Sequence, residues 1–166
     1  MPNGAMHILV GLISANVVRD FVVKKKFSLF FVLVAAFGSV LPDVDIALYW
    51  LLNVFREVPL SLVHRQFTHT LLLPLLLLLI AFIFIKKEKV FLFFSMLSLG
   101  AFTHLVLDSL FIGTIIPFYP ISGIYFGLNL VPDTQMAQTV VLVIEGVLLL
   151  GWLSYLYYRH KVKDFI

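Results

Sequence analysis

The chain has 166 residues, of which 61% are hydrophobic and only 13% are charged. Soluble globular domains average about 45–50% apolar and about 25% charged residues, so these few charges cannot cover the surface of a soluble domain of this size. We therefore expect lipid to be its main solvent. The net charge of +3 comes from Lys and Arg residues that lie mainly in three short clusters. Such clusters are typical of membrane-topology signals and exclude an ordinary nucleic-acid-binding surface.

Five apolar stretches predict membrane-spanning helices, and hence an all-α, polytopic helix bundle that forms a single domain over residues 1–166. They cover residues 7–23, 27–41, 71–85, 90–110 and 138–158. The second and third offer only about 22 Å of apolar helix for a core of about 30 Å, so each must tilt or extend into the polar motif at its end. Residues 46–57 are too short to span and predict an interfacial or re-entrant helix. Residues 111–136 form a loop rich in Gly, Pro and aromatic residues, which suits the headgroup level.

The basic clusters predict the orientation of these helices. They lie at positions 24–26, 86–89 and 159–163, after the first, third and fifth stretches. With five crossings all three fall on one side, which the positive-inside rule makes the cytoplasm. We therefore predict a multi-pass protein of the cytoplasmic membrane, with its amino terminus outside and its carboxyl terminus inside.

Ionisable residues within or beside the apolar stretches are costly and often mark function. Nine of them are candidate site residues: His7, Asp43, Asp45, His64, Arg65, His69, His104, Asp108 and Glu145. Four of them lie 15–17 residues from the nearest lysine cluster, namely His7, Asp43, His69 and His104. This separation corresponds to about 22–26 Å of helix in each case. The common depth predicts one site near the outer face of the membrane.

The spacing of these residues indicates what they can bind. His104 and Asp108 are four residues apart, which places imidazole and carboxylate on one helix face. Pro42 ends or kinks the preceding helix, so Asp43 and Asp45 can converge in a turn. Two carboxylates at the edge of a membrane repel each other unless a cation holds them. Asp43 alone is also compatible with a simple Pro-Asp turn.

The remaining residues leave alternatives open. His64 and His69 would diverge by about 140° on a regular helix, so one of them, or both with an irregular turn, can face the site. Arg65 offers a fork of donors that suits a phosphate, or it reaches to the interface as a long basic side chain. Glu145 is an acid-base group, a hydrogen-bond donor to a neighbouring helix, or an acid that burial keeps protonated. We name Asp45, Arg65 and Glu145 as candidate catalytic residues.

The donor types predict the cofactor. Neutral imidazoles and carboxylates without thiolates suit Zn²⁺ first, with Mn²⁺ or Fe²⁺ as alternatives. Four histidines and three carboxylates exceed the needs of one tetrahedral ion, so we expect one or two ions. Two-metal sites cleave phosphoesters by in-line attack. The hydroxyl groups of Thr68 and Thr103 are candidates for hydrogen bonds that orient the ligands.

Four sequence motifs resemble a known family. They are Ala5-Met6-His7, LPDVD at 41–45, HRQFTH at 64–69 and HLVLD at 104–108. Their order and spacing over about residues 5–120 resemble the YdjM family of inner-membrane, metal-dependent hydrolases. The resemblance implies a membrane-embedded hydrolase with the metal ligands His7, Asp43, Asp45, His64, His69, His104 and Asp108. The order is also similar to part of the zinc phospholipase C group. No His follows His104 until His160, so we expect at most two ions.

We therefore expect a hydrolase that uses a metal-activated water on a phosphoester at headgroup level, such as a lipid or lipid-linked phosphate. Arg65 would hold the phosphate, and the aromatic loop at 118–126 would cover the site. The alternatives are a metal or cation transporter and a membrane protein with a closed, structural metal site. The apolar stretches at 27–37 and 75–85 disfavour a polar path to the cytoplasm. The expected partner is the lipid bilayer and not nucleic acid; the sequence sets no oligomeric state.

Overall fold

The computed structural model describes residues 4–23, 26–60, 63–64, 67–111 and 113–159. The regular secondary structure of these residues is helical, and besides the helices there are two isolated β-bridges and no named strand. The predicted all-α class is therefore confirmed. The elements are α1 (Gly4–Val17) with a π-helical turn η1 (Val18–Val22), α2 (Phe30–Gly38), a short 3-10 turn η2 (Leu41–Asp43), α3 (Val44–Phe55), α4 (Leu72–Ile83), α5 (Glu88–Leu110) and α6 (Gln135–Arg159).

Three helical segments of the described chain are long and apolar enough to cross a membrane: Gly4–Val22, Glu88–Leu110 and Gln135–Arg159. A bent pair, Phe30–Gly38 with Leu41–Phe55, makes up to four, and its two parts meet at an angle of 41°. The bend includes Pro42, which lacks a backbone donor and interrupts the helix. All five predicted stretches contain a helix. However, α4 has 12 residues or about 18 Å, so a fifth crossing stays a prediction.

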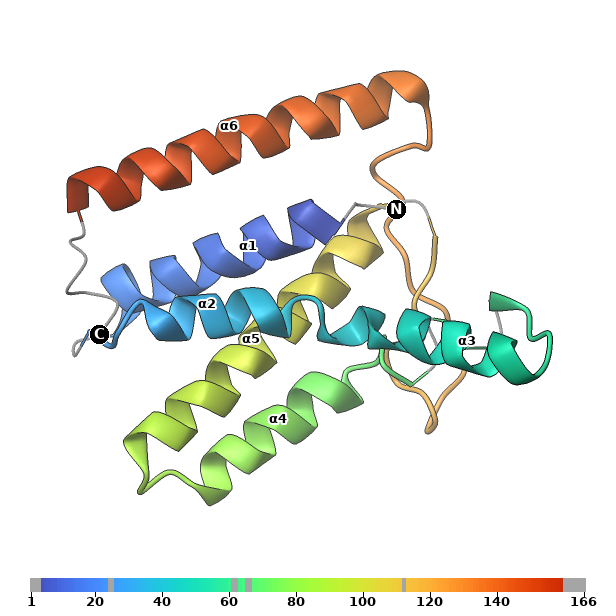
Figure 1. Ribbon diagram of the computed structural model, residues 1–166, viewed down its shortest axis with the longest axis horizontal. Coiled ribbons are helices and arrows are strands. Elements are labelled where there is room, and N and C mark those ends of the chain that lie inside the picture. Colours follow the sequence, from blue (N-terminus) through green and yellow to red (C-terminus); the bar gives the residue numbers. More distant parts are fainter. Residues whose placement is uncertain (1–3, 24–25, 61–62, 65–66, 112, 160–166) are drawn as a thin grey trace.

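α5 is the centre of the bundle, since α1, α2 and α4 all pack against it (Figure 1). Glycines bring α2 and α5 unusually close together. A Cβ atom on Gly100 would run into the carbonyl oxygen of Ala35 and the amide nitrogen of Ser39, and one on Gly38 would run into the backbone of Leu97. Small residues of this kind allow close backbone approach between membrane helices.

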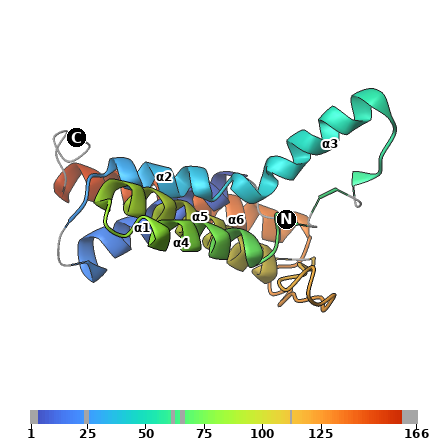
Figure 2. The same cartoon turned by 90° about the horizontal axis from the view of Figure 1, so that it is seen from below.

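α3 projects away from the bundle as a continuation of α2 beyond the bend (Figure 2). Its apolar side chains are exposed, including Trp50 at 68% and Phe55 at 81%. The structure thus contains the short apolar helix predicted at 46–57, and it begins at Val44. Such a helix carries the aromatic and aliphatic surface that inserts into a membrane interface.

α6 lies alongside α1 and is almost wholly exposed within the molecule. Two side-chain hydrogen bonds attach its carboxyl-terminal half to α1 and to the following turn η1. Trp152 Nε1 donates to Asn16 Oδ1 at 3.3 Å, and the Tyr155 hydroxyl donates to Asp20 Oδ2 at 2.6 Å. The exposed remainder of α6 is therefore available to lipid.

The loop between α5 and α6 folds back over the end of the bundle. The backbone amides of Leu128 and Leu130 donate to the carbonyl oxygens of Ser109 and Leu110 at the end of α5. The loop also contacts the segment before α4, where the amide of Leu71 donates to the carbonyl oxygen of Pro117 at 2.9 Å. These bonds place part of the loop beside the segment that carries His69.

Candidate metal centre

The seven predicted metal ligands gather in one cluster at the end of the bundle where η2 joins α3. Three overlapping groups account for all of them: His7, His104 and Asp108; Asp43, His69 and His104; and Asp45, His64 and His69. They come from α1, η2, α3, α5 and the segment between α3 and α4. Helix α5 supplies two ligands from its last two turns, and the bend after α2 supplies two more. Residues distant in sequence are thus brought to one place, as the common depth predicted.

Three ligand atoms in the middle of the cluster form a nearly regular triangle. His69 Nε2 lies 3.4 Å from Asp43 Oδ1, and His104 Nε2 lies 3.7 Å from the same oxygen. The two imidazole nitrogens are 3.2 Å apart. Two ligands of a tetrahedral ion, each about 2.0–2.1 Å from the metal, lie about 3.3–3.4 Å from each other. The triangle therefore has the size of one face of a tetrahedral metal site.

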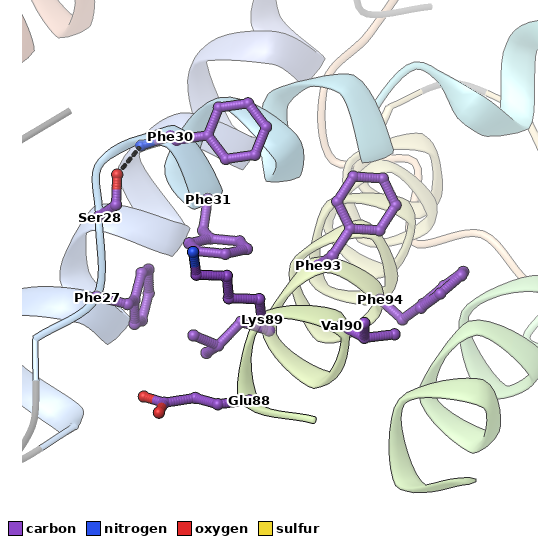
Figure 3. Close-up of a pocket in the computed structure, with 10 residues that line it drawn as sticks. Phe27, Ser28, Phe30, Phe31, Glu88, Lys89, Val90, Phe93 and Phe94 are labelled. Atoms are coloured by element: carbon purple, nitrogen blue, oxygen red, sulfur yellow. Dashed lines mark hydrogen bonds between the residues drawn. The ribbon is translucent and has the colours of Figure 1, made fainter. Parts of the chain in front are cut away.

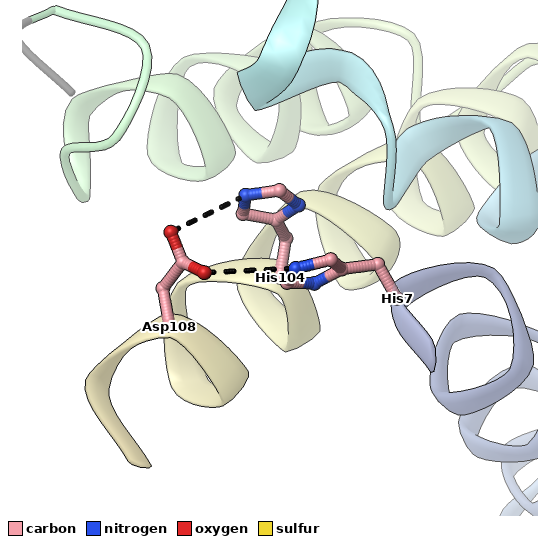
Figure 4. A group of neighbouring side chains, drawn as sticks. All are labelled: His7, His104 and Asp108. Atoms are coloured by element: carbon pink, nitrogen blue, oxygen red, sulfur yellow. Dashed lines mark ion pairs between the residues drawn. The ribbon is translucent and has the colours of Figure 1, made fainter. Parts of the chain in front are cut away.

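One carboxylate oxygen of Asp108 faces this triangle, and its other oxygen faces a third histidine, His7. Its Oδ2 lies 3.5 Å from His69 Nε2 and 3.7 Å from His104 Nε2. Its Oδ1 lies 3.6 Å from His7 Nε2, and the His7 ring stacks on the His104 ring at 3.8 Å (Figure 4). A carboxylate in this position can bridge two cations.

His7 is buried, and the described residues hold no group that orients its second ring nitrogen. Its side chain is only 3% exposed, and its Nδ1 has no hydrogen-bond partner within the described residues. Buried polar atoms in native proteins almost always have partners. An ion at Nε2 would not satisfy this Nδ1, so the candidate ligand role of His7 rests on its contact with Asp108.

Hydrogen bonds fix the orientation of the two central imidazoles. His104 Nδ1 donates to the carbonyl oxygen of Ser39 at 2.7 Å, which leaves the Nε2 lone pair directed to the cluster. His69 Nδ1 lies 3.3 Å from Asp45 Oδ2, which also accepts a hydrogen bond from the Thr68 hydroxyl at 2.7 Å. Both arrangements are typical of metal-binding histidines, whose second ring nitrogen is held by a carbonyl or carboxylate.

Asp45 also contacts His64, whose Nδ1 lies 2.9 Å from Asp45 Oδ1. This is a hydrogen-bonding distance and is shorter than the edge of a tetrahedral site. The arrangement fits a carboxylate that orients two imidazoles, although these three residues also form one of the groups that can hold an ion. Thr68 has the supporting position predicted for it. The Thr103 hydroxyl instead donates to the carbonyl oxygen of Gly100 within its own helix.

The electrostatics of the cluster favour a cation. Three carboxylates surround four imidazoles, and six of the seven side chains are at most 9% exposed, whereas Asp43 is 26% exposed. Burial lowers the pKa of His69, but its hydrogen bonds to Asp43 and Asp45 outweigh this effect and raise the pKa above its usual value. Buried carboxylates need compensating positive charge. Nitrogen and oxygen donors with this net negative charge fit one or two divalent cations.

The three predicted catalytic residues differ in what the described structure says of them. Arg65 lies outside the described residues, as does His160. Glu145 lies on α6, where it is buried, and it belongs to none of the three ligand groups. Their predicted roles are therefore untested, while Asp45 lies inside the cluster.

The sequence interpretation missed the contribution of Ser39. Its carbonyl oxygen reaches His104 because Gly100 and Gly38 let α5 and α2 approach each other. A signal for this approach exists in the sequence, because Ala35 and Ser39 form a small-xxx-small pattern of the kind found at membrane-helix interfaces.

A cavity of about 720 Å³ lies at the other end of α2 and α5 (Figure 3). Its lining includes Phe27, Phe31, Lys89 and Phe93 and contains none of the seven ligands. Because the donor atoms are gathered at the opposite end of these helices, we assign the candidate site to the histidine and aspartate cluster rather than to this larger space.

One family of membrane proteins matches the chain. The model of the family described as "YdjM inner membrane protein" matches residues 1–163, well beyond the 5–120 over which the motifs resemble it. None of the curated proteins and none of the solved structures matches. The family and the apolar helices together show an integral protein of the inner membrane, in contact with the lipid bilayer. The chain belongs to the YdjM inner membrane protein family.

Proposed function

We propose that the chain is a membrane-embedded, metal-dependent hydrolase that acts on a phosphoester at the level of the lipid headgroups. The observation that carries this proposal is the triangle of Asp43, His69 and His104, completed by an Asp108 carboxylate whose second oxygen faces His7. This donor set supports a pair of cations bridged by one carboxylate, with Zn²⁺ as the first choice and Mn²⁺ or Fe²⁺ as alternatives. Phosphoesters are the substrates that two-metal centres commonly cleave.

The residues of the chain have separate tasks in this proposal. A divalent cation held here would polarise the phosphoryl oxygens and lower the pKa of a water to about 7. His69 and His104 present their Nε2 atoms, and Asp45 and the Ser39 carbonyl keep them in place. The Asp45–His64 pair, 2.9 Å apart, is positioned as a proton acceptor oriented by a carboxylate. Arg65 remains the candidate for holding the phosphate, and Glu145 a candidate acid-base residue.

The membrane arrangement that we propose keeps five crossings, with α4 as a short span. The lysine clusters support this arrangement, because the cluster at 86–89 lies where α4 is joined to α5 and the cluster at 159–163 begins at the last residue of α6. α5 carries His104 and Asp108 in the turns farthest from residues 86–89. With the lysines in the cytoplasm, the metal centre lies near the outer face and the amino terminus is outside.

Turnover of phosphoesters by the purified, zinc-loaded protein tests the proposal. We expect hydrolysis of a lipid phosphate and a loss on the order of 100-fold or more in His104→Ala. Thr103→Ala is the matched control, because its hydroxyl bonds only to its own helix in the described structure, and it should keep most of the activity. Zinc flux into liposomes without turnover would instead favour the transporter. Retained zinc without turnover of any phosphoester would favour a structural site.

A further inference from the structure

Asp43 is the exposed edge of the metal centre. Its side chain is 26% exposed, whereas the other six candidate ligands are at most 9% exposed. A recess of about 160 Å³ lies beside it and is lined by Phe37, Val40, Leu41, Asp43 and Val44. Asp43 is the one polar side chain among these lining residues. The accessible side of the metal centre is therefore bordered by apolar side chains.

The recess continues an apolar stripe that follows α2. The side chains of this stripe recur every three or four residues along one face and are 38–66% exposed: Phe30, Leu33, Phe37, Val40 and Val44. In a chain that crosses a bilayer, an exposed apolar stripe of this kind faces the acyl chains. The stripe thus connects the lipid phase directly to the exposed carboxylate of Asp43.

We infer that the site takes an amphiphilic phosphoester from the bilayer, with its phosphate beside Asp43 and its hydrocarbon chain against Phe37, Val40 and Val44. This inference rests on the proposed function and specifies its substrate class as a long-chain phosphate ester rather than a water-soluble one. A soluble ester would gain nothing from these side chains. Burial of only about two methylene groups corresponds to about tenfold in affinity.

Binding of phosphonates to the zinc-loaded protein in detergent tests the inference without any turnover, because their carbon–phosphorus bond is not hydrolysed as an ester. The two probes are ethylphosphonate and dodecylphosphonate, measured by calorimetry. Val40→Trp fills the recess. The matched control is Leu79→Trp on α4, which adds the same group at an exposed apolar position outside the stripe and lines neither this recess nor the cavity at the other end of α2.

We expect the wild type and Leu79→Trp to bind dodecylphosphonate about tenfold or more tightly than ethylphosphonate. Val40→Trp should lose this preference and keep both its zinc content and its affinity for ethylphosphonate. Detergent partitioning affects all variants equally, so the ratio between variants reports the recess. Phe37→Ala, which enlarges the recess without adding bulk, should weaken the preference in the same direction and serves if Val40→Trp does not fold.

Several outcomes overturn the inference. These are a chain-length preference that survives in Val40→Trp and Phe37→Ala, an equal loss in Leu79→Trp, or no phosphonate binding by the zinc-loaded wild type. Failure of the proposed function looks different. Binding that depends on chain length, without hydrolysis of any ester, would support the hydrocarbon site and contradict the hydrolase activity. Hydrolysis at a rate that does not depend on chain length would support the hydrolase activity and contradict the hydrocarbon site.

Discussion

The Nδ1 atom of His104 donates a hydrogen bond of 2.7 Å to the carbonyl oxygen of Ser39. Ser39 is the carboxyl-terminal cap of α2, directly after Gly38, and the carbonyl groups at the end of a helix have no partner within the helix. The bond therefore satisfies a helix end and at the same time fixes the tautomer of His104 that leaves Nε2 available to a cation. Helix packing and ligand orientation are coupled at this one contact.

This coupling predicts the effect of Gly100→Ala. The added methyl group would run into the Ala35 carbonyl and the Ser39 amide, so α5 must shift away from α2. Overpacking of this kind costs about 1–3 kcal/mol, and the shift also weakens the bond to His104. We expect a lower melting temperature in detergent and weaker zinc binding.

The control for Gly100→Ala is Gly146→Ala on α6, where an added Cβ meets no other atom within 4 Å. It should leave zinc binding unchanged and stabilise the helix slightly, because alanine is the better helix former. Equal effects of the two substitutions would show that close packing of α2 and α5 does not matter to the centre.

The geometry predicts two cations that depend on different residues. His7 contacts only the Oδ1 side of Asp108 among the ion pairs described, whereas Asp43, His69 and His104 form the central triangle. His7→Ala should therefore reduce the zinc content from two ions per chain to one, measured by mass spectrometry of the metal in purified protein. An unchanged zinc content would remove His7 from the ligand set.

Asp45 should act by holding His69 and His64 rather than by carrying an ion alone. Loss of such a supporting carboxylate typically costs about 10–100-fold in metal affinity. We expect Asp45→Asn to weaken zinc binding by this order while full occupancy is still reached at high zinc. Competition with a coloured chelator measures the affinity. A permanent loss of one ion would identify Asp45 as a ligand instead.

Removal of the metal should destabilise the protein, because three carboxylates are then gathered without a compensating cation. Binding to the folded state alone adds about 2.7 kcal/mol of stability at a ligand concentration of 100 Kd. We expect a chelator to lower the melting temperature and zinc to restore it. The double variant His7→Ala/His104→Ala should melt at one temperature with or without chelator.

The absence of cysteine allows a direct test of the membrane arrangement. A single cysteine placed at Lys87, between α4 and α5, should react with an impermeant maleimide only after the membrane is opened. A cysteine at Ser122, in the loop before α6, should react in intact cells. Labelling of both positions from the same side would contradict a single crossing by α5. The reversed labelling pattern would show that the orientation is opposite to the one predicted.

Much of the centre could be predicted from the sequence because its physical cause is local. The distances of His7, Asp43, His69 and His104 from the lysine clusters fix their depth once each stretch is a helix. The four-residue spacing of His104 and Asp108 sets their shared face in the same way. These constraints place the ligands at one level of the bundle, and the packing of α1, α2 and α4 against α5 brings them together.

Other features depend on contacts between distant segments and could not be predicted. The sequence predicted an interfacial or re-entrant helix after the second crossing, but not that this helix, α3, continues α2 through a bend of 41°. Whether His64 can reach the cluster depended on the irregular segment before α4, which places it against Asp45. The division between ligands and supporting groups likewise follows from ring orientation, which Ser39 and Asp45 decide.

X-ray absorption at the zinc edge of the zinc-loaded protein tests the central claim most directly. The account predicts nitrogen and oxygen ligands at about 2.0–2.1 Å, without sulfur, and the outer scattering of at least two imidazoles. A second zinc about 3.5–4 Å away should also be visible and should disappear in His7→Ala. A zinc shell of water and carboxylate oxygen alone, without imidazole scattering, would contradict it.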